Sequence, residues 1–152
     1  METMLIPVLA AFAACAGFSV IYNIHGPGIL ICALGGALGW LTYLLAGFLW
    51  EDIMQTLCAS VVIALYAEIM ARIRRCPVTG YLLVAIFPLV PGAGVYHTME
   101  HAVNGENEAF LDTFLHTLGL AGAIAVGVLL VSSLVRMWGI FRHHTTLKEG
   151  RT

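Results

Sequence analysis

Five long runs of apolar residues, separated by short polar breaks, dominate the pattern of the chain. The runs cover residues 4–22, 28–49, 53–71, 81–103 and 110–135. Each is long enough for an α-helix that crosses a bilayer, which takes about 20 residues. The breaks cover residues 23–27, 50–52, 72–78 and 104–109. Because such short connections force neighbouring helices to run antiparallel, the pattern predicts an all-α, five-helix transmembrane bundle at residues 1–142 and a short cytoplasmic tail at 143–152.

The fourth run contains two prolines and two glycines, Pro88, Pro91, Gly92 and Gly94. Proline lacks the N–H donor of a helix and clashes with the preceding turn, so two prolines three residues apart predict a broken helix. At about 1.5 Å of rise per residue, Pro88 lies about 14 Å beyond Thr79, where the helical segment begins, and so near the middle of the bilayer. Broken backbone at that depth is tolerated where it is buried in protein or lines a watery cavity, and such helices often carry transporter substrate sites. The alternative is a kink that only shapes packing.

A second half-helix is expected to begin at Gly92. Its N-terminus would carry free N–H groups and the positive end of the helix dipole, and both favour a substrate carboxylate. Tyr96, one turn further along, is placed to orient the substrate. The candidate substrate-binding residues are therefore Pro88, Pro91, Gly92, Gly94 and Tyr96.

The composition is that of an integral membrane protein. The chain is 60% apolar and 11% charged, and its mean hydropathy is +0.91, whereas soluble domains contain about 25% charged residues. Too little polar sequence remains for a soluble catalytic domain, so we do not expect an enzyme. The net charge of −2 argues against a nucleic-acid partner.

The cysteines and the N-terminus give no further function. The four cysteines, Cys15, Cys32, Cys58 and Cys76, are scattered without metal-binding spacing, and we assign them no role, no metal and no cofactor. The first apolar run resembles a signal peptide at residues 11–13. It lacks a positively charged start and continues to Tyr22, so we expect a first membrane helix.

The basic residues predict the orientation. One basic group lies between the third and fourth runs and another follows the fifth; they contain Arg72, Arg74, Arg75, Arg142, Lys148 and Arg151. Two spans separate the groups, so both fall on one side, which the positive-inside rule makes cytoplasmic. The opposite side receives only acidic residues, namely Glu2, Glu51, Asp52, Glu106 and Glu108. The expected topology has the N-terminus outside and the C-terminus inside.

Five titratable residues lie within the last two apolar runs. His97, Glu100 and His101 share one face of the half-helix after the break, and Asp112 and His116 share a face of the next helix. Counting back from a hairpin tip near residue 106 places His101 level with Asp112 and His97 level with His116. Ionisable groups inside a membrane are candidates for proton relays, so we assign all five to proton coupling. The alternative is a polar rim.

The residues His97-x-x-Glu100-His101 also match the pattern of inverzincin metallopeptidases. A zinc site would need both histidines and a third ligand, with Glu100 as general base, and His116 or Asp112 is available as that ligand. A membrane-embedded metal site or metalloenzyme on this face is therefore an alternative function.

Small residues at helical spacing predict close helix contacts. The two ridges are formed by Gly35 and Gly39 in the second run, and by Gly119, Ala123 and Gly127 in the fifth. Small residues let membrane helices approach closely. We expect packing within the chain, with a homo-oligomer interface as the alternative. Glu68 and Arg72 are spaced for an ion pair across one helical turn.

The motif Pro88-x-x-Pro91-Gly92-x-x-x-Tyr96 in a penultimate helix resembles the threonine/serine exporter family, specifically its small five-helix subunit or C-terminal half. Other similar features are Gly17-Phe18 followed by Tyr22-Asn23, and Met99, Ala102 and Val103 after the break. The resemblance extends loosely along the chain, and the Pro/Gly motif is its specific part. His97, Glu100 and His101 lie outside this pattern.

The resemblance implies a helical module in the bacterial inner membrane that works with a larger homologous membrane subunit. The implied activity is export of small carboxylate-bearing metabolites, such as threonine, serine or succinate-type dicarboxylates, driven by the proton motive force. We therefore expect the chain to be one half of a secondary exporter. The rival hypotheses are the metal site above and a non-transporting assembly subunit.

Overall fold

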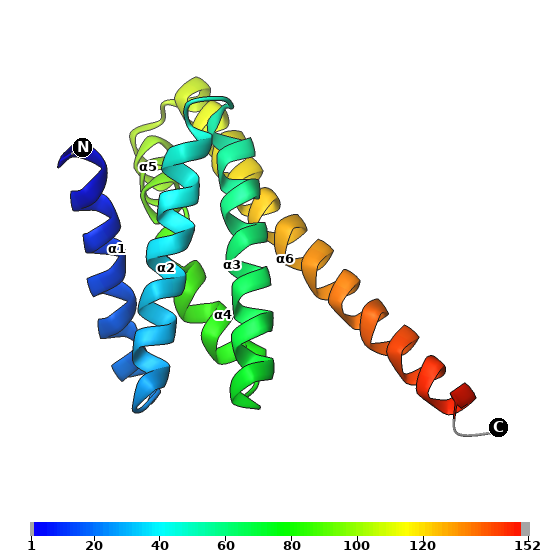
Figure 1. Cartoon of the computed structure of the whole chain (residues 1–152). Coiled ribbons are helices and arrows are strands. Elements are labelled where there is room, and N and C mark those ends of the chain that lie inside the picture. The colour runs from blue at the N-terminus through cyan, green and yellow to red at the C-terminus, as the bar shows by residue number, and fades with distance from the viewer. Residues whose placement is uncertain (1, 150–152) are drawn as a thin grey trace.

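A computed structural model describes the backbone of residues 2–149 and the side chains of residues 4–137. Within these residues the chain is helical apart from short connections (Figure 1). The elements are α1 (Glu2–Ile21), α2 (Pro27–Ala46), α3 (Asp52–Arg74), α4 (Val78–Ile86), the 3₁₀ helix η1 (Phe87–Leu89), α5 (Gly92–Asn104) and α6 (Asn107–Glu149). The all-α prediction is confirmed.

The apolar pattern also predicted the membrane-spanning segments. Helices α1, α2 and α3 and residues 107–137 of α6 are long and apolar enough to cross a membrane. The segments Val78–Leu89 and Gly92–Asn104 pass the same test together, with a bend of 54° between them. The predicted fourth helix is thus two helices joined by η1. The predicted tail at 143–152 is helical backbone as far as Glu149, and residues 150–152 lie outside the described residues.

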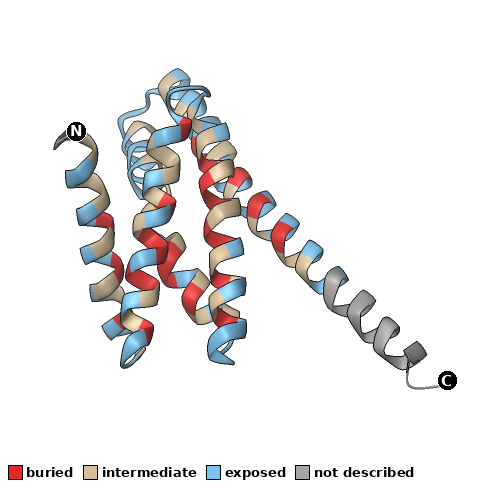
Figure 2. Cartoon of the chain, in the orientation of Figure 1, coloured by how far each residue is buried: buried red, intermediate tan, exposed pale blue. Residues whose placement is uncertain are grey.

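Helices α1 to α4 pack against one another around buried residues, which Figure 2 shows in red. One buried cluster joins Cys15 of α1, Cys32 of α2 and Ala67 of α3 to Tyr81 and Val84 of α4. Small side chains permit the close approach of helices that lipid alone does not drive together. This part of the molecule is the bundle that the sequence predicted.

The predicted glycine ridges pack within the chain. A Cβ atom added at Gly39 would lie 2.2 Å from Cδ1 of Ile63, and one added at Gly127 would lie 2.0 Å from Oγ of Ser60. Real Cβ atoms do not approach that closely, so both glycines are required by helix contacts. Packing within the chain is confirmed for the two ridges.

Helix α6 lies beside α3 and runs in the same direction. Gly119 faces Ile53, and Gly127 faces Ser60 seven residues further along α3. Near the other end of α3, the guanidinium of Arg72 donates a 3.5 Å hydrogen bond to the carbonyl of Val135. Arg72 also lies 3.8 Å from Glu68, which confirms the predicted ion pair.

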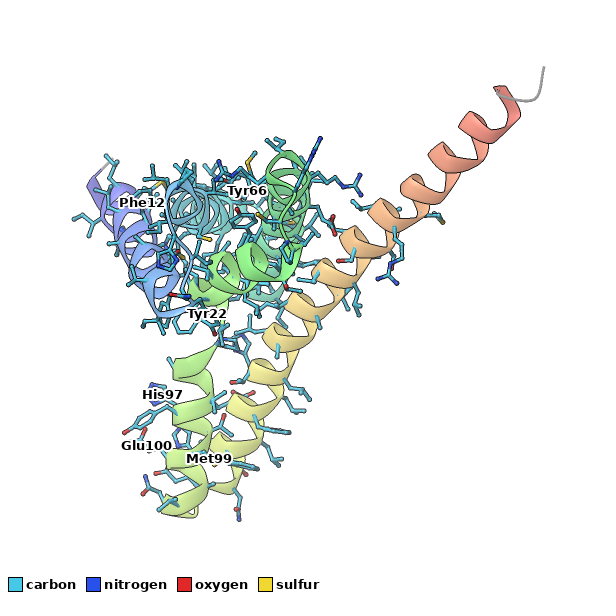
Figure 3. The ribbon with its side chains drawn as sticks, turned by 90° about the horizontal axis from the view of Figure 1, so that it is seen from below. Phe12, Tyr22, Tyr66, His97, Met99 and Glu100 are labelled. Carbon is cyan, nitrogen blue, oxygen red and sulfur yellow. The ribbon has the colours of Figure 1, made fainter. Side chains whose placement is uncertain are left out.

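Helix α5 packs against α6 and not within the bundle. The two helices form a hairpin that leans away from α1–α4 (Figure 3). The prediction of a single compact five-helix bundle, made from the short connections, is therefore wrong for the α5–α6 hairpin. The reason is the 54° bend after η1, which turns α5 away from the direction of α4.

The charged connections separate to two ends of the molecule (Figure 1). We call the basic end the one with residues 22–26 and 75–77, which includes Arg75 and lies next to Arg74. We call the acidic end the one with residues 47–51 and 105–106, which includes Glu51 and Glu106. The charge separation that the sequence predicted is present. Connections 22–26 and 75–77 lie at one end of the molecule, and connections 47–51 and 105–106 lie at the other.

Candidate functional site

The break begins where Pro88 interrupts the hydrogen bonding of α4. The carbonyl of Val84 would accept from the amide of residue 88 in a continuous α-helix, but proline has no N–H. It accepts instead from the amide of Phe87, one residue earlier, and from the thiol of Cys15 in α1 at 3.2 Å. The thiol therefore satisfies a carbonyl that the proline exposes, which gives the buried Cys15 a structural role.

The second proline continues the break in the same way. Pro91 cannot donate to the carbonyl of Phe87, which accepts from Val90 at 3.2 Å. These shortened bonds make residues 87–89 a 3₁₀ turn, and Leu89 is buried against the bundle. The backbone at Pro91 (φ −77°, ψ 57°) forms an inverse γ-turn, in which the amide of Gly92 donates to the carbonyl of Val90 at 2.8 Å.

The γ-turn changes which amides are available. The first hydrogen bond of α5 joins the amide of Val95 to the carbonyl of Pro91 at 3.1 Å, and no side chain caps the helix. Since Gly92 already donates within the turn, the amides of Ala93 and Gly94 are the pair left without an acceptor among the described residues. Gly92 is therefore not a free donor, and the free N–H groups expected at the start of this half-helix are those of the two residues that follow it.

The other substrate-site candidates have different surroundings. A Cβ atom at Gly92 would meet open space, whereas one at Gly94 would lie 2.4 Å from Oγ1 of Thr117 on α6. Gly94 is thus a point of close contact between α5 and α6. Tyr96 is 65% exposed. Its ring packs edge-on against the ring of His97, with 5.4 Å between the ring centroids.

The polar residues of α5 form pairs along the exposed side of the hairpin. Nδ1 of His97 lies 3.0 Å from Oε2 of Glu100, and His101 contacts Glu106 at the hairpin tip. His97 and Glu100 lie on the side of α5 that faces away from α6 (Figure 3). These pairs connect neighbouring turns of the hairpin and do not reach the bundle.

The register of the hairpin differs from the expected one by two residues. Gly94 faces Thr117, so antiparallel counting places His97 level with Phe114 and His101 level with Phe110. The tip consists of Gly105 and Glu106, so the centre of the turn lies one residue earlier than the expected pairs require. The expected convergence of five titratable groups is therefore wrong.

His116 belongs to a different cluster. Its Nε2 atom lies 3.6 Å from Oδ2 of Asp52, the first residue of α3, and the hydroxyl of Tyr43 on α2 donates to Oδ1 of the same carboxylate. Side chains from α2, α3 and α6 thus meet at the acidic end. Asp112 is exposed and forms no ion pair within the described residues.

The sequence contains a signal for this cluster that spacing analysis missed. His116 lies three residues before Gly119, so it extends the ridge Gly119–Ala123–Gly127 by one turn along the face that packs on α3. Thr117, the neighbouring residue, faces α5 instead. Since consecutive helical residues point about 100° apart, His116 and α5 are on different sides of α6.

The metal alternative finds no support in this arrangement. Within the described residues, no group of three or more His, Cys, Asp or Glu side chains is placed to hold a metal ion. His97 and His101 are each engaged by a separate carboxylate. The pattern His97-x-x-Glu100-His101 therefore reflects helical spacing.

Together, the fold and the site define a helical membrane protein whose penultimate apolar segment is broken by a Pro/Gly motif. The chain belongs to a family of membrane exporters. The family described as "Threonine/Serine exporter, ThrE" matches residues 7–134, which include the break and most or all of each spanning helix. This confirms the resemblance noted in the sequence, and the family's transport description is consistent with a non-enzymatic function.

A longer relative is also similar. An uncharacterized protein of Haemophilus influenzae is 26% identical over 139 residues, a match that covers 86% of this chain and 47% of the relative. The chain thus spans about half the length of that protein. No solved structure matches the chain.

Proposed function

We propose that the chain is one half of a secondary exporter of small carboxylate-bearing metabolites in the inner membrane of a bacterium. The substrates are amino acids of the threonine and serine type or dicarboxylates of the succinate type, and export is coupled to protons. Membership of an exporter family supports the reaction class. The substrate class rests on the chemistry of the break.

The observation that carries this proposal is the pair of amides at the start of α5. Ala93 and Gly94 have no acceptor among the described residues, and they lie at the positive end of the α5 dipole. Two adjacent N–H groups match the two oxygens of a carboxylate, and N-termini of helices are established anion sites. In this proposal Pro88, Pro91 and Gly92 shape the break, Gly94 donates, and Tyr96 contacts the rest of the substrate.

A second half is needed to complete the site. The chain aligns with 47% of its Haemophilus relative, and that protein therefore has further sequence of similar extent. We assign the missing half to a larger homologous membrane subunit, with a second copy of the chain as the alternative. The α5–α6 hairpin presents exposed apolar side chains for such a contact, including Tyr96, Met99, Leu111 and Leu115.

The orientation and the coupling groups follow from the charges. We place the basic end in the cytoplasm, because Arg72, Arg74 and Arg75 lie there. The acidic end and the hairpin tip then face outward. Proton coupling is assigned to the His116–Asp52 pair and to the paired residues of α5, His97, Glu100 and His101, with Asp112 as an exposed relay group.

The test is efflux of labelled succinate and threonine from membrane vesicles that contain the chain with its larger homologous subunit, and from vesicles with either alone. Gly92→Leu fills the space before the two free amides, and we expect at least a tenfold loss of export. The control is Gly122→Leu on α6, which also meets open space but is far from the break in sequence. Loss of export only in Gly92→Leu supports the proposal.

Export at the normal rate by Gly92→Leu would contradict a substrate site at these amides. The rival hypothesis, a non-transporting assembly subunit, makes a different prediction. In that case the larger subunit would require the chain to reach the membrane in its folded form, but Gly92→Leu would leave both its assembly and its export unchanged.

A further inference from the structure

A cavity of about 360 Å³ lies at the basic end, far along α4 from the break. The connection between α1 and α2 contributes His25, and the connection between α3 and α4 contributes Cys76. Arg74, Gly28, Thr79 and Tyr81 also line it. The cavity therefore joins both of the connections that the structure places at this end.

The start of two helices meets in this cavity. Gly28 is the second residue of α2, and Thr79 and Gly80 are the second and third residues of α4. Amides in the first turn of a helix have no acceptor within the helix, and neither helix has a side-chain cap. Helices α2 and α4 run in the same direction, so the positive ends of both dipoles point to the same space.

A cation and the hydroxyl of Tyr81 complete the lining. Arg74 reaches the cavity and forms no ion pair within the described residues, whereas its neighbour Arg72 is paired with Glu68. Tyr81 is only 6% exposed, yet its hydroxyl is close to Arg74 and Cys76 at the cavity. No carboxylate of residues 4–137 lines the cavity.

We propose that this cavity binds an anionic group, a carboxylate or a phosphate, between the side chains of Arg74 and Tyr81 and the first turns of α2 and α4. A guanidinium presents several N–H donors in the geometry that such oxyanions accept. The hydroxyl and the uncapped amides supply the remaining donors. The second cavity, of about 240 Å³ between α5 and α6, has no charged residue in its lining and suits no anion.

The anionic group has two possible sources. It is either a free metabolite or the headgroup of an anionic lipid, since the cavity lies at an end of the membrane helices. The role of this cavity as an entry site for an exported carboxylate depends on the proposed exporter function. Anion binding by itself does not depend on that function.

The experiment uses the purified full chain in nanodiscs of zwitterionic lipid, titrated with succinate or inorganic phosphate and followed by calorimetry and melting temperature. Arg74→Gln should weaken binding about tenfold or more, because a charge-assisted contact is lost. Tyr81→Phe should weaken it about two- to tenfold, as expected for a neutral donor. The matched control is Arg75→Gln, which removes the same charge from the next residue but does not line the cavity.

A second set of nanodiscs contains anionic phosphatidylglycerol. Binding of the free anions that depends on Arg74 and not on Arg75 identifies a metabolite site. Stabilisation by phosphatidylglycerol with the same dependence, without binding of free anions, identifies a lipid headgroup. Equal effects of Arg74→Gln and Arg75→Gln, or no dependence on Arg74 with either probe, would overturn the proposal.

Tyr81→Phe decides the question if Arg74→Gln does not fold, since unchanged binding in that variant would also overturn the proposal. The two proposals fail separately. Export with normal rates in Arg74→Gln would remove the entry site and leave the exporter, whereas anion binding without export would leave the cavity and remove the exporter.

Discussion

Gly92 and Gly94 lie in the first turn of α5, two residues apart, but their surroundings differ. A side chain at Gly92 would enter open space, and one at Gly94 would collide with Thr117. The sequence showed both as parts of one flexible break. The structure separates their roles, because Gly94 permits the contact with α6 and Gly92 keeps the approach to the free amides open.

We predict that Gly94→Ala destabilises the protein by about 1–3 kcal/mol, the usual range for overpacking a close contact. Gly92→Ala should have a small or stabilising effect of about 1 kcal/mol or less, since it reduces backbone freedom without a clash. Unfolding in mixed micelles, followed by circular dichroism, measures both. The double variant Gly94→Ala/Thr117→Ala should recover most of the loss, because the alanine removes Oγ1 and Cγ2 of Thr117. A double variant no better than Gly94→Ala would place the clash elsewhere.

His116 gives a second prediction at the residue scale. Its contact with Asp52 spans 3.6 Å, and the two side chains are 51% and 42% exposed. An exposed pair of this kind contributes about 0–1 kcal/mol, so its removal should hardly alter stability. If the pair carries protons, His116→Gln should instead change the pH dependence of export, because a glutamine side chain cannot take up and release a proton. Asp112→Asn is the control, and an unchanged pH profile in His116→Gln would leave the pair as a polar rim.

At the scale of the elements, the broken helix could be predicted from Pro88 and Pro91, because proline removes a hydrogen bond whatever the surroundings. The details of the break could not. The γ-turn that uses the amide of Gly92 and the thiol of Cys15 that reaches Val84 both depend on packing against α1 and on local dihedral angles. Sequence spacing carries no information on either.

The break itself yields a prediction about its two residues Pro91 and Gly92. The double variant Pro91→Ala/Gly92→Ala restores an N–H at residue 91 and a helix-forming residue after it, so α4 and α5 can join and satisfy the free amides internally. We expect export to fall at least tenfold, while insertion and stability stay equal or increase, because a continuous helix is favoured in lipid. Vesicle efflux and melting temperature measure the two effects. Export at the normal rate by a well-folded double variant would mean that the break serves packing alone.

At the scale of the whole molecule, the apolar pattern predicted the spans and the ends that share a side. It did not predict that the α5–α6 hairpin points away from helices α1–α4. Short connections at residues 75–77 and 105–106 limit where a helix begins, but the 54° bend decides where α5 goes. His116 meets Asp52 on α3 and not His97 on α5 because it lies on the face of α6 that packs on α3. Antiparallel counting therefore could not predict which titratable residues on different helices contact each other.

The orientation in the membrane can be tested with a native reporter. Cys76 is exposed at the basic end, Cys15 and Cys32 are buried, and Cys58 lies within α3. If the basic end is cytoplasmic, a membrane-impermeant maleimide added to intact cells stripped of their outer membrane should leave Cys76 unlabelled. Permeabilisation should then label it, and Cys76→Ser should abolish that signal. A cysteine introduced at Glu106, at the acidic end, should be labelled without permeabilisation. The reverse pattern would invert the topology, and the cavity at Arg74 would then face outward, where it could not serve as an entry site for export.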